Sequence, residues 1–132
     1  MTANLSLITE NIVLCELQGT FDVETYAVME GALPMMVREL PHAVGVILYL
    51  SSGAKLPNLS GILQEIGILC RVMPSNFCMF VGVGQGVLLA NPLSMMLASF
   101  VLKRYYKHSQ VKVARSIEQA ITLINASCGD AG

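Results

Sequence analysis

Apolar residues along the chain fall into short runs of strand length that alternate with stretches of helical spacing. Two of the runs, 43–50 and 77–83, are almost continuously apolar, which is typical of strands buried on both faces. A polar turn, Thr9-Glu10-Asn11, separates the first two runs and indicates a hairpin. The pattern therefore predicts five strands, at residues 5–8, 12–17, 43–50, 77–83 and 111–114.

The first two predicted helices lie on either side of the strand at 43–50. Asp22 is the expected N-cap of the first one. Gly31 and Pro34 are expected to break or kink this helix, with a resumed turn through Leu40. Asn58 is the expected cap of the second helix, whose apolar residues recur at helical spacing. That stripe consists of Leu59, Ile62, Leu63, Ile66, Cys70 and Met73.

Two more helices are predicted in the second half of the chain. Asn91 as cap and Pro92 at the first helical position begin one that reaches about Tyr106. Ser116 caps the last helix, and Gln119 three residues later completes a capping-box pattern. The apolar stripe of this last helix consists of Ile117, Ala120, Ile121 and Ile124.

The order of elements is β-β-α-β-α-β-α-β-α, which defines the fold class. Alternation of this kind predicts an α/β protein with a single mostly parallel or mixed sheet and helices covering the sheet. At 132 residues we expect one domain, with an ordered core at about 5–126 and a short flexible tail at 127–132.

Composition narrows the class further. Hydrophobic residues make up 54% of the chain and charged residues only 13%, which excludes a disordered protein. Four cysteines in a chain of this length exclude a disulfide-stapled mini-protein. No signal peptide is visible, so a cytoplasmic protein is expected. The interval between Arg71 and Lys103 has no charge, but Pro74, Asn76 and the Asn91-Pro92 pair divide it into a strand and a helix.

The positive charges gather late in the chain, next to Tyr105 and Tyr106. Such a cluster could bind phosphate or nucleic acid. The favoured interpretation is the polar end of one helix followed by the exposed face of a strand, and no nucleic-acid partner is expected. The cluster consists of Lys103, Arg104, Lys107, Lys112 and Arg115.

Residues for catalysis or metal binding do not converge in the sequence. His42 and His108 lie in separate segments, and none of the cysteines forms a CxxC pair. Glycines at 82, 84 and 86 are expected to open a loop after a strand, but Val87 stands where a dinucleotide fingerprint needs glycine. We therefore expect no enzyme, no cofactor and no metal site. A redox pair of Cys70 with Cys78 is a minor alternative.

Ser60 lies in the first turn of the second predicted helix, on the face opposite the apolar stripe. Unpaired backbone N–H groups and the helix dipole favour added negative charge there, so a phosphate would be compatible with the fold. A serine that only satisfies the backbone is the simpler interpretation from the residues alone, and both interpretations stay open.

The strand ILYLSS and the following LPNLSGILQEI resemble the signature of STAS domains. This is the family of bacterial anti-sigma-factor antagonists and of the cytoplasmic tails of sulfate transporters. The family has Asp-Ser-Ser-Gly before a leucine-rich helix, where this chain has Asn58, Leu59, Ser60 and Gly61. The segment ARSIEQAITLI is similar to the family's closing strand and helix, and the order of elements matches over residues 5–126.

The resemblance implies a non-catalytic signalling module in which Ser60 is the phosphorylated serine. It also implies a protein partner, such as an anti-sigma kinase or a larger sensory complex. That partner would bind the loop and helix start, through Ser52, Lys55, Asn58, Leu59, Gly61 and Gln64.

Two further interactions stay open for this fold. The uncharged Arg71–Lys103 interval and the eight methionines are also compatible with binding a lipid, a small apolar ligand or a membrane surface. The helix at 92–106 is so apolar that we expect a partner, a ligand or a second copy, as in a homodimer, to cover part of it.

Overall fold

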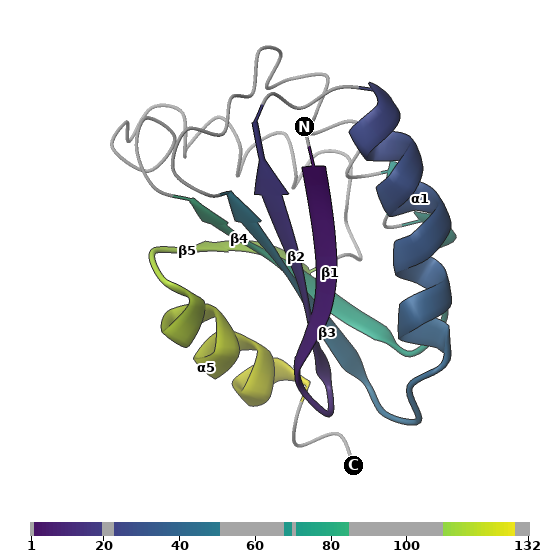
Figure 1. The fold of residues 1–132 in the computed structure, drawn as a ribbon. Helices are drawn as coiled ribbons and strands as arrows, with labels where there is room; N and C mark the ends of the chain where they lie inside the picture. The colour runs from purple at the N-terminus through teal and green to yellow at the C-terminus, as the bar shows by residue number, and fades with distance from the viewer. Residues whose placement is uncertain (1, 20–22, 51–67, 70, 85–109, 129–132) are drawn as a thin grey trace.

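The computed structural model describes residues 2–19, 23–50, 68–69, 71–84 and 110–128 (Figure 1). Residues 68–69 and 71–72 are helical, within the region where the second helix is predicted. The longer elements are β1 (Thr2–Thr9), β2 (Ile12–Gln18), α1 (Val23–Arg38), β3 (Val44–Leu50), β4 (Phe77–Gly84), β5 (Gln110–Ala114) and α5 (Ile117–Ser127).

All five strands form one sheet in the order β1-β2-β3-β4-β5. Strands β2 to β5 are parallel to one another, and β1 is antiparallel to β2. The predicted α/β class with a mostly parallel sheet is therefore confirmed. A parallel arrangement brings the C-terminal ends of β2, β3, β4 and β5 to one edge, which we call the carboxyl edge of the sheet.

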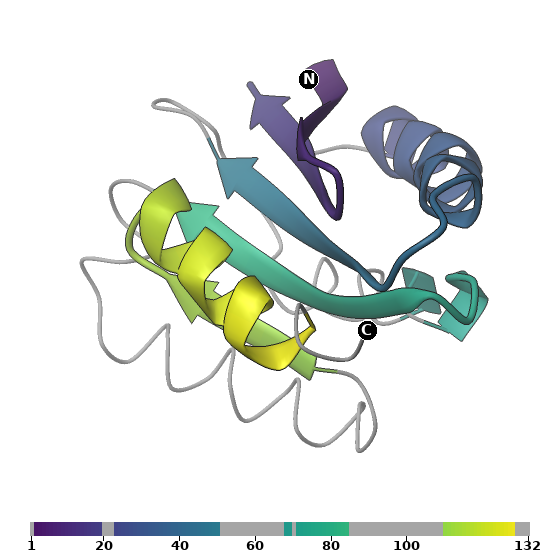
Figure 2. The same cartoon turned by 90° about the horizontal axis from the view of Figure 1, so that it is seen from below.

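The sheet lies between two helices, and each of its faces has its own hydrophobic core. Helix α1 lies on one side of the sheet and α5 on the other (Figure 2). Strand β2 contributes to both cores, because Val13 and Cys15 are buried on the α1 face and Ile12 on the α5 face.

Helix α1 continues through Pro34, so the predicted break of this helix is wrong. Pro34 is buried, and its packing offsets the hydrogen bond that proline cannot donate. Backbone hydrogen bonds continue the turn as far as Leu40, whose N–H donates to the Val37 carbonyl over 3.1 Å. Asn76, in the turn before β4, closes this end of the helix. Its Nδ2 donates to the backbone carbonyls of Val37 (2.6 Å), Leu40 (3.0 Å) and His42 (3.2 Å).

Helix α5 follows the predicted pattern. Ala120 and Ile124 are fully buried, and Ile117 and Ile121 pack against the same core at partial burial. The cap is also as predicted, because the Gln119 N–H donates to Ser116 Oγ over 3.1 Å. The side chain of Gln119 accepts from the N–H of Arg115 rather than from that of Ser116.

Four details differ from the sequence analysis. Gly82 and Gly84 belong to β4 instead of opening a loop. The buried apolar residue in the short helical stretch before β4 is Leu69, which the predicted stripe omits. The flexible tail was predicted to start at residue 127, but α5 extends to Ser127 and Cys128 is buried. Cys78 forms a disulfide with Cys128 and not with Cys70.

None of the helices in the described part of the chain is both long and apolar enough to cross a membrane. The predicted helix at 92–106, the surface proposed for a second copy or an apolar ligand, falls outside the described residues.

Candidate functional site

The carboxyl edge is the best placed part of the sheet for a functional site. In open parallel sheets, binding sites form where the strands end at their carboxyl side. Strand β3 is central in the sheet, with two strands on each side, and it ends at Leu50. The predicted partner-binding segment, 52–64, follows directly and therefore starts from the middle of this edge.

The predicted site residues themselves lie outside the described part of the chain. The phosphorylation site Ser60 is among them, and so is the whole predicted partner-binding set. That set consists of Ser52, Lys55, Asn58, Leu59, Gly61 and Gln64. The strand that leads into this segment, β3, is described up to Leu50.

The strand register defines a row of side chains near the carboxyl edge, on the α5 face. Pairing across the sheet aligns Asn4, Glu16, Tyr49, Val83 and Ala114 in this order. Val83 and Ala114 are buried in the core beneath α5. Glu16 and Tyr49 are half-buried and Asn4 is exposed, so the end of the row nearest β1 is polar and reaches solvent.

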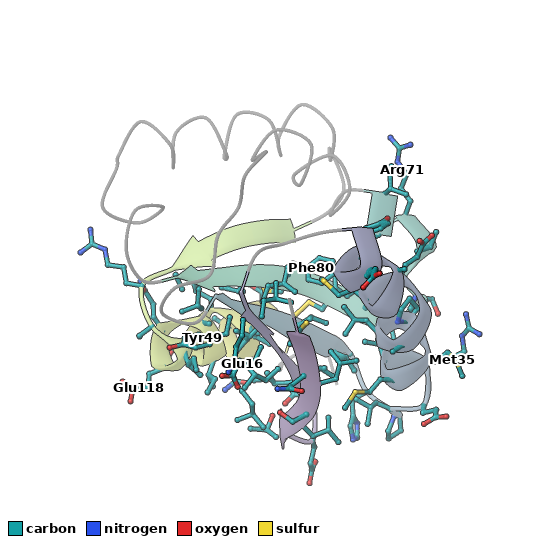
Figure 3. All side chains as sticks on the ribbon, turned by 45° about the horizontal axis from the view of Figure 1, so that its top comes forward. Glu16, Met35, Tyr49, Arg71, Phe80 and Glu118 are labelled. Atoms are coloured by element: carbon teal, nitrogen blue, oxygen red, sulfur yellow. A yellow bond between two sulfur atoms is a disulfide. The ribbon has the colours of Figure 1, made fainter. Side chains whose placement is uncertain are left out.

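Glu16 is the only charged residue in the sequences of β2, β3 and β4. Its carboxylate Oε1 accepts a hydrogen bond of 3.2 Å from Gln18 Nε2 on the same strand. Glu16 and Tyr49 are paired positions on neighbouring strands (Figure 3), so their side chains share one face of the sheet. A carboxylate, an amide and a phenol are therefore available for hydrogen bonding next to the predicted segment.

The start of α5 adds charged groups to the same end of the sheet, since α5 begins three residues after β5 ends. Glu118 lies in the first turn of α5 and is exposed, which is favourable at the positive end of a helix dipole. Arg115 precedes the cap and is also exposed. The groups here are suited to polar contacts with another macromolecule.

Among the described residues, no three His, Cys, Asp or Glu side chains gather closely enough to hold a metal ion. His42 approaches Glu10 at 4.0 Å in a surface pair, away from the carboxyl edge. Burial raises the pKa of the Cys15 thiol to about 12, which removes its nucleophilic form at neutral pH.

The described part of the basic cluster agrees with a solvated surface. Lys112 in β5 and Arg115 after it are both exposed. The other members of the cluster, Lys103, Arg104 and Lys107, fall outside the described residues.

Glu16 and Tyr49 were not predicted as site residues. A signal for Glu16 was present, because a charge inside an otherwise apolar strand needs a solvent-exposed position or a partner. Tyr49 had no comparable signal, since a tyrosine within a buried strand is ordinary. Only the register between β2 and β3 brings these two residues together.

Comparison with known proteins identifies the fold. No family model matches the chain, and no curated protein matches its sequence. Among solved structures, the chain is similar to the anti-sigma factor antagonist SpoIIAA in its unphosphorylated form. The TM-score is 0.56 at 16% sequence identity, and the match covers 95% of this chain and 97% of that one. The fold is therefore STAS-like, as the resemblance in the sequence implied.

Proposed function

We propose that the chain is a non-catalytic regulatory module of the anti-sigma-factor-antagonist type. The observation that carries this proposal is the likeness to SpoIIAA over nearly the whole length of both chains. The Asn58-Leu59-Ser60-Gly61 sequence adds to it, because in this fold order it follows the central strand β3. The partner is a protein, with an anti-sigma kinase or a sensory complex as the candidate, and the module acts in the cytoplasm.

The partner would dock at the carboxyl edge, on segment 52–64 and on the polar row formed by Asn4, Glu16 and Tyr49. Glu16 and Tyr49 reach solvent beside the start of this segment and offer an acceptor and a phenol to the partner. Protein interfaces favour tyrosine at such positions because its rigid ring provides contact area together with a polar tip. Both groups would then add contacts to those made by the segment itself.

Phosphorylation of Ser60 would act as the switch. A phosphate adds nearly two negative charges and three acceptor oxygens to the surface that the partner covers. Glu16 and Glu118 already place negative charge at this end of the sheet. Repulsion and the cost of desolvating the phosphate would together release the partner.

The first experiment asks whether a kinase from the native host uses Ser60. Incubation with the host's anti-sigma kinases and ATP should add a single phosphate, mapped to Ser60 by peptide mass spectrometry. Ser60→Ala should abolish this labelling, whereas the control Ser6→Ala, an exposed serine on β1, should leave it intact. Labelling that persists in Ser60→Ala would refute the assignment.

The second experiment measures partner binding with Ser60→Ala and Ser60→Asp. The alanine variant should bind as tightly as the native chain, and the aspartate variant should bind more weakly. Equal binding of both variants would exclude the switch. Glu16→Gln and Tyr49→Phe should each weaken binding of the partner. If both variants bind the partner as tightly as the native chain does, Glu16 and Tyr49 lie outside the interface.

A further inference from the structure

The disulfide between Cys78 and Cys128 connects the start of β4 to the residue that caps the end of α5. The two cysteines are 50 residues apart in sequence, and their Cα atoms are 6.1 Å apart. That distance lies in the range of ordinary disulfide bridges. Cys128 is buried and Cys78 is half-buried, so Cys78 is the more exposed residue of the pair.

A β-bulge in β4 is what turns Cys78 toward α5. Val44 pairs with Phe77 and Gly45 pairs with Met79, so Cys78 is an extra residue with no partner in β3. In a regular strand, Cys78 would share a face with Phe80, since side chains alternate with a period of two. The bulge shifts this alternation by one residue and re-aims the side chain.

The packing on both faces agrees with this shift. Phe77 and Phe80, three positions apart, both pack on the α1 face, with ring centroids 4.7 Å apart. Cys78 and Met79, although adjacent, both belong to the core on the α5 face. The bulge therefore places the Cys78 sulfur on the only face from which Cys128 can be reached.

The last turn of α5 is held at two neighbouring points. Ile124 packs directly onto Gly45 of β3, where no side chain intervenes. Four residues later, Cys128 donates its N–H to the Ile124 carbonyl over 2.7 Å and bonds to Cys78. Gly45 pairs with Met79 of β4, and Cys78 is the residue before Met79. The disulfide therefore lies next to the contact between Ile124 and Gly45.

We propose that Cys78 and Cys128 form a reversible redox site that clamps the end of α5 to the sheet and takes its electrons from a dithiol. A thiolate of the dithiol attacks the Cys78 sulfur, and a mixed disulfide forms as the Cys78–Cys128 bond breaks. Cys128 leaves as a thiolate and takes up a proton. The second thiol of the dithiol, as a thiolate, then resolves the mixed disulfide, and Cys78 leaves and is protonated. In total two electrons and two protons reach the pair, and the dithiol becomes a disulfide.

The other described cysteine takes no part in this exchange. Cys15 is buried in the core on the α1 face, across the sheet from the pair. The redox site also lies at the end of the sheet opposite the carboxyl edge, since Cys78 is at the start of β4. Its chemistry therefore goes beyond the proposed partner binding and can be tested without a partner.

The test follows the native chain through a series of glutathione buffers from fully oxidised to fully reduced. Thiols are quenched by alkylation, and peptides are mapped by mass spectrometry. We expect a peptide linking Cys78 to Cys128 at the oxidised end and two alkylated cysteines at the reduced end. Dithiothreitol should give the same reduced chain, which before alkylation is heavier than the oxidised chain by two hydrogen atoms. Removal of the reductant in air should restore the disulfide.

The structural consequence is read by hydrogen exchange and by thermal unfolding. Reduction should raise amide exchange in residues 121–128 by about tenfold while exchange in α1 stays unchanged. Loss of a cross-link that closes so long a loop should lower the Tm by about 10 °C. The double variant Cys78→Ala/Cys128→Ala should no longer respond to the reductant, and Cys15→Ala should respond as the native chain does.

Three results would overturn the proposal. They are free thiols at Cys78 and Cys128 in every buffer, a bond that persists in every buffer, and unchanged exchange in 121–128 after reduction. Because the native chain carries the measurement, a poorly folded double variant would not affect the outcome.

Discussion

Gly45 lies beneath α5, and a larger residue at its position would have to displace the side chain of Ile124. A Cβ built on Gly45 would stand 2.5 Å from Ile124 Cγ2 and 2.8 Å from Ile124 Cγ1 and Cδ1. Real Cβ atoms do not approach carbon atoms so closely, and the Ile124 side chain is fully buried. Glycine is needed here for close approach and not for an unusual backbone angle.

Gly45→Ala should therefore destabilise the protein by about 1–3 kcal/mol, the usual cost of overpacking a core. Urea unfolding followed by circular dichroism measures this free energy. Gly31→Ala is the matched control, because nothing lies within 4 Å of its added methyl group and the site is helical. That control should be neutral or stabilising by up to about 1 kcal/mol. Equal effects of the two substitutions would contradict the packing of α5 on β3.

Cys15 should be inert to thiol reagents in the folded protein. Its pKa is raised to about 12 by burial, so almost no thiolate exists at pH 8. Iodoacetamide should label Cys15 only after denaturation in guanidinium chloride, as followed by peptide mass spectrometry. Labelling of Cys15 in the native protein at pH 8 would contradict its placement in the core.

The same pKa shift predicts a dependence of stability on pH. In the unfolded chain the pKa of the Cys15 thiol has its ordinary value of 9.0, whereas burial in the folded chain raises it to about 12. The unfolded state therefore binds fewer protons in this window, and stability falls as the pH rises. Between pH 9 and 10 the loss from this group should be about 1 kcal/mol. Cys15→Ala should remove that part of the pH dependence, measured by urea unfolding.

The side chain of Asn76, in the turn before β4, forms hydrogen bonds at the C-terminal end of helix α1. Asn76 donates to the carbonyls of Val37, Leu40 and His42, in the last turn of the helix and in the loop that follows it. The same residue accepts at its backbone carbonyl from the N–H of Val44, at the start of β3. One residue thus joins the end of α1, the loop after it and the first residue of β3.

Asn76→Asp should destabilise the protein by about 2–4 kcal/mol, because carboxylate oxygens would face three carbonyl oxygens and donate nothing. Asn76→Ala should cost less, about 1–3 kcal/mol, since it removes the three hydrogen bonds without placing a negative charge against the carbonyl oxygens. Asn125→Asp, at an exposed position on α5, is the matched control and should have little effect. Thermal unfolding at neutral pH measures the stability of all three variants. An Asn76→Asp variant as stable as the native chain would contradict the role assigned to these hydrogen bonds.

Element types and their order were predictable because each depends on local pattern. The apolar runs of β3 and β4 and the Ser116 cap of α5 are visible in the sequence, and all were confirmed. The continuation of α1 through Pro34 was not predictable, since tertiary burial offsets a local helix breaker there. The bulge at Cys78 was not predictable either, because a bulge is a property of the register between two strands.

The strand that precedes the predicted site segment was predictable from its apolar run, but its place at the centre of the sheet was not, because strand order is a property of the packed sheet. The polar row of Asn4, Glu16 and Tyr49 joins three strands, and it required the register of β1 and β3 on β2. The Cys78–Cys128 bond likewise joins segments whose proximity only the packed sheet determines.

At the scale of the whole molecule, the two ends of the sheet carry different features. The carboxyl edge carries Asn4, Glu16 and Tyr49, while the opposite end holds the disulfide and the hydrogen bonds of Asn76. A helix covers each face of the sheet (Figure 2), so α1 and α5 stabilise the sheet from both sides. The likeness to SpoIIAA extends over nearly the whole chain and is not confined to one motif.

The affinity of the partner for two forms of the chain tests the central claim most directly. The chain would be prepared unphosphorylated and singly phosphorylated at Ser60, and each form would be titrated into the host's anti-sigma kinase by isothermal calorimetry. The account predicts that phosphate on Ser60 weakens binding by more than about tenfold, which corresponds to about 1.4 kcal/mol. Equal dissociation constants for the two forms would contradict it.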